Sequence, residues 1–170
     1  MSKKTRERPL VIVLSEGTLR AVNCEEAANI CSSLRESNLM GPDYTLDKLE
    51  ALYQLALGNS VYENEIGWNA VTKLLNKINV KLSVFLVYHD LRRKGRPVRT
   101  SPYPRSNLML ERSGKKIEIL VLEAGSKVRL GDLVEWARLV QASNHTPVLA
   151  VVDELGVITY YEVLSSSALT

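Results

Sequence analysis

The chain has 170 residues, enough for one domain of ordinary size or for two small ones that share an interface. Hydrophobic residues make up 45% of it and charged residues 24%, which is ordinary for a folded globular protein and excludes an intrinsically disordered one. The formal net charge is only +3, but six Arg or Lys and no acid lie between Leu91 and Leu110. Such a local surplus attracts polyanions, of which nucleic acid is the commonest large one. A merely solvated basic loop is the alternative.

The first elements in chain order are a β-hairpin and a helix. Residues 10–22, "LVIVLSEGTLRAV", hold two β-rich runs around a Ser-Glu-Gly turn. The apolar run at residues 10–14 is too short for a signal peptide or a membrane span. In the helix that follows, Asn23 is a plausible N-cap, with Glu26 three residues later as in a capping box.

Two cysteines, Cys24 and Cys31, fall seven residues apart within this predicted helix. Two turns of helix separate such residues by roughly 10 Å, which is too far for a disulfide. We therefore expect core thiols in a reducing compartment and a cytoplasmic protein. With only two His in the chain, no zinc cluster is expected.

Two further helices are predicted in the first half. Thr45 can cap the first, and Gly58 ends it. Apolar residues recur at helical spacing in both, at Leu46, Leu49, Leu52, Tyr53 and Leu57 in the first and at Val71, Leu74, Leu75 and Ile78 in the second. The first half is therefore a short hairpin followed by helices.

The second half alternates helices and pairs of strands. An apolar and then basic helix ends at Gly95, and two strands flank a turn at residues 112–115. An amphipathic helix, a buried strand, an acidic turn at residues 153–156 and a last strand follow. The apolar face of that helix comprises Leu130, Leu133, Trp136, Ala137 and Val140. This pattern predicts an α/β (α+β) protein with a small N-terminal helical and β-hairpin domain, residues 1–79, and a mixed-sheet C-terminal domain, residues 80–170.

The residues alone offer little catalytic chemistry. A metal-dependent nuclease needs clustered carboxylates, often with a Glu-x-Lys pair. Glu118 and Glu123 lie on one predicted strand, but no lysine stands two residues after either. Metal-free RNA cleavage draws a base, an acid and a cation from Tyr, His and Lys. His89 and His145 are the only histidines, and each reads equally well as a packed or surface residue.

One motif carries a resemblance. "VYHDLRRKG", with Tyr88, Asp90, Leu91, Arg92 and Gly95, resembles the "Y-x-D-L-R-x-R-G" element of the archaeal tRNA-splicing endonuclease family. The resemblance extends through "EILVLE" and "ARLV" to "LAVVDELGVITYYEV", which resembles the final hairpin of the family. In the first half, "LEALYQLALGNSVY" resembles its helix-then-strand passage. The resemblance implies a C-terminal domain of the nuclease type and an N-terminal domain of the family's kind.

The resemblance also implies where catalytic residues would lie. The family uses a tyrosine, a histidine and a lysine, and the matching positions here hold Leu110, Lys116 and His145. The family's "G-x-K-F-G" approach to the tyrosine is replaced by "SPYPRSN". Because leucine has no titratable proton, the resemblance implies a non-catalytic, structural subunit of a heteromeric form of the enzyme.

Such a subunit implies partners. The resemblance predicts a heterotetramer of two copies of this chain and two of a catalytic subunit. The acidic turn, Asp153 and Glu154, would dock into a basic pocket of a neighbour, although a solvated turn is the alternative. The terminal strand would pair subunits side by side through Val157, Ile158, Thr159, Tyr160 and Tyr161.

The substrate follows from the same resemblance. The assembly would excise introns from precursor tRNA at bulge–helix–bulge sites, without metal or cofactor, leaving a 2′,3′-cyclic phosphate and a 5′-hydroxyl. Arg138 matches one of two arginines that clamp a bulged base, whereas no arginine occurs at the second position, near Tyr160. The expected RNA-facing residues are Arg92, Arg93, Lys94, Arg96, Arg99 and Arg138.

Two alternatives stay open at this point. One is a self-sufficient ribonuclease with a shifted set of Tyr103, His145 and Lys116. The other is an interaction module without RNA binding, which would lack any salt-dependent affinity for RNA.

Overall fold

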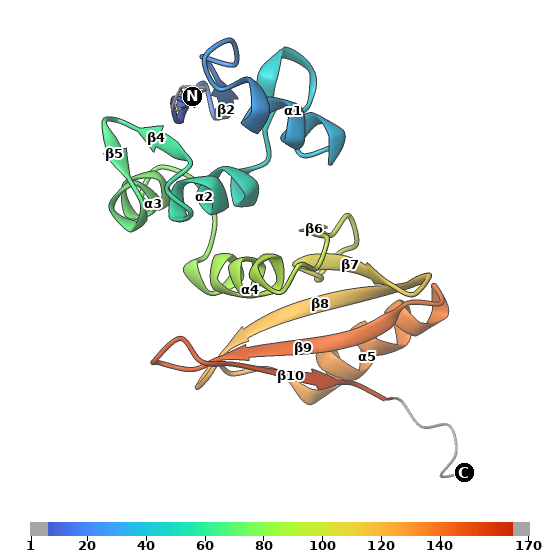
Figure 1. Ribbon diagram of the computed structural model, residues 1–170. Coiled ribbons are helices and arrows are strands. Elements are labelled where there is room, and N and C mark those ends of the chain that lie inside the picture. The colour runs from blue at the N-terminus through green and yellow to red at the C-terminus, as the bar shows by residue number, and fades with distance from the viewer. Residues whose placement is uncertain (1–6, 165–170) are drawn as a thin grey trace, which may run out of the picture. The chain divides into compact units, whose positions relative to one another are not determined.

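The computed structural model describes residues 7–164, and the chain divides into two compact units, Met1–Val80 and Lys81–Thr170 (Figure 1). Each unit contains helices and a five-stranded sheet. The predicted α/β class is therefore confirmed. Among the described residues, no helix has both the length and the apolar character needed to span a membrane.

The sheet of the N-terminal unit has the strand order β3-β2-β1-β4-β5. Its strands are β1 (Leu10–Ser15), β2 (Thr18–Ala21), β3 (Thr45–Leu46), β4 (Ser60–Tyr62) and β5 (Glu65–Ile66). The predicted hairpin is confirmed as β1 and β2. Glu16 and Gly17 both have positive φ, 50° and 77°, as a tight two-residue hairpin turn requires. The two-residue strands β3 and β5 were not predicted, because they are too short to show a periodic pattern.

The helices of this unit are α1 (Ala28–Glu36), a short 3₁₀ helix η1 (Pro42–Tyr44), α2 (Lys48–Ala56) and α3 (Trp68–Leu75). The predicted helices are thus present, but the cap of α2 was wrong. Asp47 is the N-cap, and its carboxylate accepts hydrogen bonds from the N–H groups of Leu49 and Glu50 at 2.9 and 3.2 Å. Thr45 instead lies in β3.

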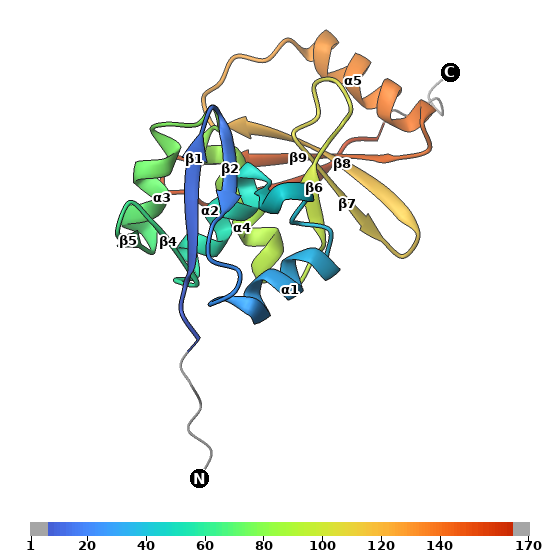
Figure 2. The same ribbon diagram turned by 90° about the horizontal axis from the view of Figure 1, so that it is seen from above.

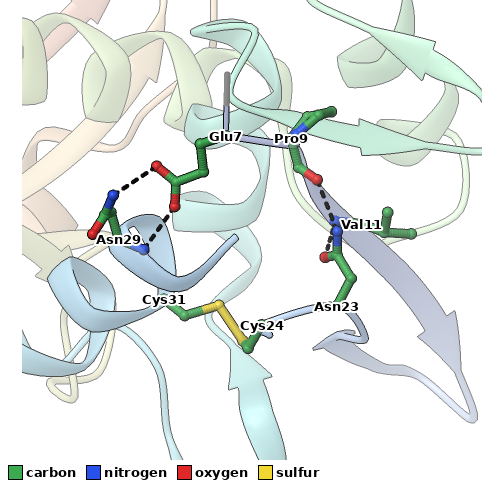
Figure 3. Close-up of a disulfide and its surroundings, with 7 residues drawn as sticks. All are labelled: Glu7, Pro9, Val11, Asn23, Cys24, Asn29 and Cys31. Atoms are coloured by element: carbon green, nitrogen blue, oxygen red, sulfur yellow. Dashed lines mark hydrogen bonds between the residues drawn. A yellow bond between two sulfur atoms is a disulfide. The ribbon is translucent and has the colours of Figure 1, made fainter. Parts of the chain in front are cut away.

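The prediction for the two cysteines was also wrong. Cys24 and Cys31 form a disulfide, with their Cα atoms 5.7 Å apart (Figure 3). The distance is short because α1 begins only at Ala28, so Cys24 lies in the preceding turn and not on the helix. The argument for a reducing compartment assumed free thiols and loses its basis.

Asn23 is not the N-cap of α1, because its side chain is used elsewhere. Its Oδ1 accepts from the Val11 N–H at 2.7 Å and its Nδ2 donates to the Pro9 carbonyl at 2.9 Å (Figure 3). The residue at the N-cap is Ala27, which offers no side-chain hydrogen bond. Residues 22–27, here called the 22–27 loop, are therefore fastened to α1 by the disulfide and to β1 by Asn23.

The sheet of the C-terminal unit has the order β10-β9-β8-β7-β6, with β8 and β9 parallel and the other neighbours antiparallel. Its strands are β6 (Val98–Thr100), β7 (Leu108–Arg112), β8 (Lys115–Glu123), β9 (Thr146–Val152) and β10 (Ile158–Glu162). The predicted pairs β7–β8 and β9–β10 are confirmed. The short edge strand β6 was not predicted.

Two helices, α4 (Leu82–Arg93) and α5 (Leu130–Ala142), cover opposite faces of this sheet (Figure 1). Side chains alternate between faces along a strand, so β8 contacts α5 with one set of side chains and α4 with the other. Leu120 packs against the α5 cluster of Trp136, Ala137 and Val140, whereas the Glu123 carboxylate accepts from Ser83 of α4 at 3.0 Å. The predicted apolar face of α5 is confirmed except at Leu130, which is 74% exposed.

Candidate functional site

Glu118 is the centre of a polar cluster on the α5 face of the C-terminal sheet. It is fully buried in β8, two residues before Leu120 and on the same face. One carboxylate oxygen accepts from the Ser101 hydroxyl, and the other lies 3.2 Å from Nδ1 of His145. A buried carboxylate is costly unless such partners satisfy it. Glu118 therefore fixes two segments distant in the sequence at one point of the sheet.

His145 follows α5 and immediately precedes β9. Its side chain is only 9% exposed. The contact with a carboxylate acceptor indicates that Nδ1 carries the proton, as in sites where a carboxylate orients a histidine. The orientation of the imidazole is thus set, and Nε2 is the nitrogen left for further hydrogen bonding.

Tyr103 lies against this histidine. The two ring centroids are 5.1 Å apart and the ring planes are at 81°, an edge-to-face contact. The Tyr103 N–H also donates to the Ser101 hydroxyl at 3.1 Å. Ser101 and His145 are half-buried, whereas Tyr103 itself is 39% exposed.

Residues 101–107, here called the 101–107 loop, connect β6 and β7 and reach toward α5 (Figure 2). The Ser101 N–H donates to the Asn107 carbonyl at 3.0 Å, which closes the loop at its base. Ser106 accepts from the Trp136 indole N–H at 2.9 Å, and Arg105 pairs with Glu135 at 3.1 Å. This segment, "SPYPRSN", is thus held to both the sheet and α5.

The three positions that the resemblance assigns to catalytic residues do not share one face. Leu110 pairs with Ile117 and Lys116 pairs with Glu111, so Leu110 and Lys116 point to opposite sides of the sheet. Leu110 is 7% exposed, within the core. Thr146 pairs with Ile117, so the register brings His145 beside Lys116. Lys116 and His145 are therefore neighbours, and Leu110 is not part of their cluster.

The basic residues predicted to face RNA are spread over different surfaces. Lys94 pairs with Asp90 at 2.7 Å and lies 5.4 Å from the centre of the Tyr160 ring, on the α4 side. Arg99 of β6 pairs with Met109, which pairs with Glu118, so Arg99 points to the α5 side. The remaining members lie at the end of α4 (Arg92 and Arg93), shortly after it (Arg96) and on α5 (Arg138).

Near the second arginine position of the family, Tyr160 has a different role. Its hydroxyl donates to Asp90 at 2.7 Å and ties β10 to α4. Burial and the Asp90 carboxylate raise the pKa of Tyr160. Burial alone would raise the pKa of Asp90, but the hydrogen bonds from Lys94 and Tyr160 outweigh it and hold that pKa below its ordinary value. His89 on the same helix packs beside Phe85, and burial together with Arg93 lowers its pKa.

The acidic turn between β9 and β10 is exposed and internally ordered. The Asp153 carboxylate accepts from the N–H groups of Leu155 and Val157 at 2.9 and 2.8 Å. Glu154 is exposed and Leu155 is 90% exposed. A cavity of about 250 Å³ lies between this turn and the start of α4. The turn therefore presents one uncommitted carboxylate and one apolar side chain.

β10 is the edge strand of its sheet. Val157 and Tyr161 are 57% and 54% exposed, whereas Ile158 and Tyr160 are half-buried and Thr159 is exposed. The outer backbone edge of the strand has no neighbour within the described residues.

A metal at the predicted carboxylates has no support from the geometry. Glu118 and Glu123 point to opposite faces of β8 and bind different hydroxyls, Ser101 and Ser83. No group of three or more His, Cys, Asp or Glu side chains that could hold a metal occurs among residues 7–164.

The link between Glu118, Ser101 and His145 was not predicted from the sequence. A signal was available, because Glu118 is the one charged residue inside the apolar run "IEILVL". A charge in a buried strand needs a partner. The partners lie 17 and 27 residues away, however, and no local sequence pattern identifies them.

Comparison with known proteins gives the family. Residues 82–160, nearly all of the C-terminal unit that the structure describes, match the family described as tRNA intron endonuclease, catalytic C-terminal domain. The chain is 32% identical over 132 residues to the tRNA-splicing endonuclease of Pyrococcus furiosus, covering 74% of this chain and 78% of that protein. This chain belongs to the tRNA-splicing endonuclease family.

Proposed function

We propose that this chain is the non-catalytic structural subunit of a tRNA-splicing endonuclease. Membership of the family supports a role in tRNA intron excision. The proposal that the chain is non-catalytic rests on Leu110, because a buried hydrocarbon side chain lies at the position assigned to the tyrosine of the family. A leucine cannot exchange a proton with a ribose hydroxyl, so general base catalysis from this position is excluded.

The chemistry then belongs to a partner chain. In the proposed reaction a 2′-hydroxyl of precursor tRNA attacks the adjacent phosphate and the bond to the 5′-oxygen breaks. The base takes the proton of the 2′-hydroxyl, and the acid protonates the leaving oxygen. The products are a 2′,3′-cyclic phosphate and a 5′-hydroxyl, and neither metal nor cofactor takes part. Bulge–helix–bulge junctions are the proposed sites.

Two features of the C-terminal unit support assembly with such a partner. The outer edge of β10 offers backbone groups for strand pairing, and exposed Val157 and Tyr161 add apolar area. The acidic turn offers Glu154 and Leu155 to a basic pocket, while Asp153 holds the turn in shape. We propose two copies of each chain in the complex.

The decisive experiment is reconstitution. This chain and a candidate catalytic subunit of the same family are purified separately and together, and each sample is assayed on an intron-containing precursor tRNA. The proposal expects cleavage by the complex and none by this chain alone. Cleavage by this chain in isolation contradicts it.

The docking role has a separate test. Replacing Asp153→Lys and Glu154→Lys together should abolish co-purification with the catalytic subunit while circular dichroism stays unchanged. Glu25→Lys with Glu26→Lys is the matched control, since this pair is also adjacent, acidic and exposed but lies in the N-terminal unit. An unaltered complex with the first variant would refute the docking role.

A second candidate function has one observation in its favour. Tyr103 contacts His145, and the strand register places the backbone of Lys116 next to that of His145, so the three side-chain types used by the family occur in one region of the α5 face. If this set were catalytic, the chain alone would cleave substrate and Tyr103→Phe would stop it. The reconstitution assay therefore decides between the two candidates.

A further inference from the structure

Tyr103 is an exposed aromatic side chain on a rigid support. Its contact with His145 covers at most one of the two faces of the phenol ring, and the side chain remains 39% exposed. Part of the phenol ring is therefore open to solvent and available for stacking.

The support is rigid for local reasons. Pro102 and Pro104 flank the tyrosine and restrict the backbone on both sides. The Tyr103 N–H is bound by Ser101, and the base of the loop is closed by the hydrogen bond between Ser101 and Asn107. A ring held in this way loses little conformational entropy when a ligand stacks on it.

Cations lie on the same face of the sheet. Arg99 belongs to the row Arg99–Met109–Glu118, and Lys116 precedes Glu118 by two residues on the same strand. Both are exposed, and neither forms an ion pair with any residue in the described part of the chain. Glu111 is the strand-register partner of Lys116, but the two side chains form no ion pair. Arg105 forms an ion pair with Glu135 and is therefore not one of these unpaired cations.

We infer that Tyr103 is a stacking platform for an unpaired RNA base, with Arg99 and Lys116 contacting the phosphates beside that base. An exposed aromatic ring with unpaired cations around it is the arrangement with which proteins bind single-stranded and bulged nucleotides. Every base has an aromatic face, so the platform selects unstacked nucleotides and not a sequence. The inference rests on the proposed function, because precursor tRNA supplies the bulged nucleotides.

The test is RNA binding by the full chain without a partner. The probe is an RNA hairpin with a three-nucleotide bulge that contains 2-aminopurine, and the same hairpin without a bulge is the comparison. Tyr103→Ala and Tyr103→Leu should weaken binding to the bulged RNA about tenfold and abolish the fluorescence quenching. Tyr103→Phe should bind within twofold of the native chain, because the ring is retained.

Two controls complete the design. Tyr44→Ala removes a tyrosine of similar exposure, 46%, from the N-terminal unit and should leave binding unchanged. Replacing Arg99→Ala and Lys116→Ala together should reduce the slope of log Kd against log salt by about 1.4, the value for two phosphate contacts on single-stranded RNA.

Each contrary outcome has a distinct meaning. Unchanged binding by Tyr103→Ala and Tyr103→Leu would overturn the stacking role. If Tyr103→Phe and Tyr103→Ala lost the same affinity for the bulged RNA, the stacking role would also be overturned. The phenol hydroxyl, and not the ring face, would then be the group that binds RNA. Because the assay needs no partner and no cleavage, its result is independent of the reconstitution experiment.

Discussion

The two units fasten a prominent loop by different means. The 22–27 loop is fixed by a covalent bond between Cys24 and Cys31 and by the side chain of Asn23. The 101–107 loop has no covalent link and is fixed by hydrogen bonds, chief among them those that converge on buried Glu118. A disulfide responds to redox potential, whereas a carboxylate with two partners responds to the loss of any one of them.

The difference makes the two loops independently testable. Amide hydrogen exchange reports local opening of each loop in the same sample. A change that loosens one loop should leave protection of the other unaltered, because the fastenings lie in separate units. Three changes break or sharpen this contrast, and a fourth tests a further contact in the C-terminal unit.

The largest effect is expected for Glu118→Ala. Ser101 and His145 lose their shared acceptor, and His145 stays in a largely buried site. Breaking a buried polar pair in this way costs about 3 kcal/mol in the free energy of unfolding. Exchange in the 101–107 loop should rise while exchange in the 22–27 loop does not. Glu111→Ala, an exposed glutamate on the neighbouring strand, should change stability by less than about 0.5 kcal/mol.

Reduction of the disulfide ranks next. The bond closes a short loop, with a sequence separation of 7. The chain-entropy model gives about 2.5 kcal/mol for its contribution to the stability of the N-terminal unit. Dithiothreitol, or Cys24→Ser with Cys31→Ser, should loosen the 22–27 loop alone. Unchanged denaturant midpoints with and without reductant would contradict the fastening role of the disulfide.

A smaller effect is expected for Ser106→Ala. The indole N–H of buried Trp136 then loses its acceptor, which costs about 1 kcal/mol. Tryptophan fluorescence and exchange of the 101–107 loop are the measurements. If Ser106→Ala moved the loop as much as Glu118→Ala, Glu118 would not be the principal anchor.

The smallest effect concerns a third fastening, the contact of α4 with β10. The hydrogen bonds from Lys94 and Tyr160 hold the folded pKa of Asp90 below its ordinary value. The ionised carboxylate therefore stabilises the unit above the unfolded pKa of about 4. This contribution is lost as the pH falls through the folded pKa. Asp90→Asn should lower stability by less than about 1 kcal/mol at neutral pH and not at all in strong acid. A constant difference across the pH range would contradict the assignment.

Elements with a clean hydrophobic period were predictable from the sequence. The α5 face was correct apart from Leu130, which lies in the first turn, where the helix has not yet reached the core. The run "PVLAVV" identified β9. Short edge strands such as β6 carry too few residues for a period to appear.

Predictions from local sequence were wrong where a side chain forms a hydrogen bond with a residue far away in the sequence. Asn23 resembles a helix cap, but its side-chain oxygen accepts a hydrogen bond from the N–H group of Val11, 12 residues earlier. The helix consequently starts later than predicted, and this shift alone brought the two cysteines within bonding distance.

The side of the sheet on which Leu110 lies was predictable from the sequence. With Ser113 and Gly114 as the two turn residues, Leu110 is opposite Ile117, so Leu110 and Lys116 must face different sides of the sheet. The contact of Tyr103 with His145, 42 positions apart, follows only from the tertiary structure.

Asn107 decides where the antiparallel ladder of β7 and β8 stops. Its amide oxygen accepts from the Val121 N–H at 2.8 Å, the group that a further residue of β7 would otherwise have bound. The Asn107 side chain thus replaces one backbone hydrogen bond of the ladder. The backbone before Asn107 need not continue the strand and crosses the face of the sheet. The same hydrogen bond occupies a backbone donor at the end of β8 with which a strand of another polypeptide could otherwise have paired.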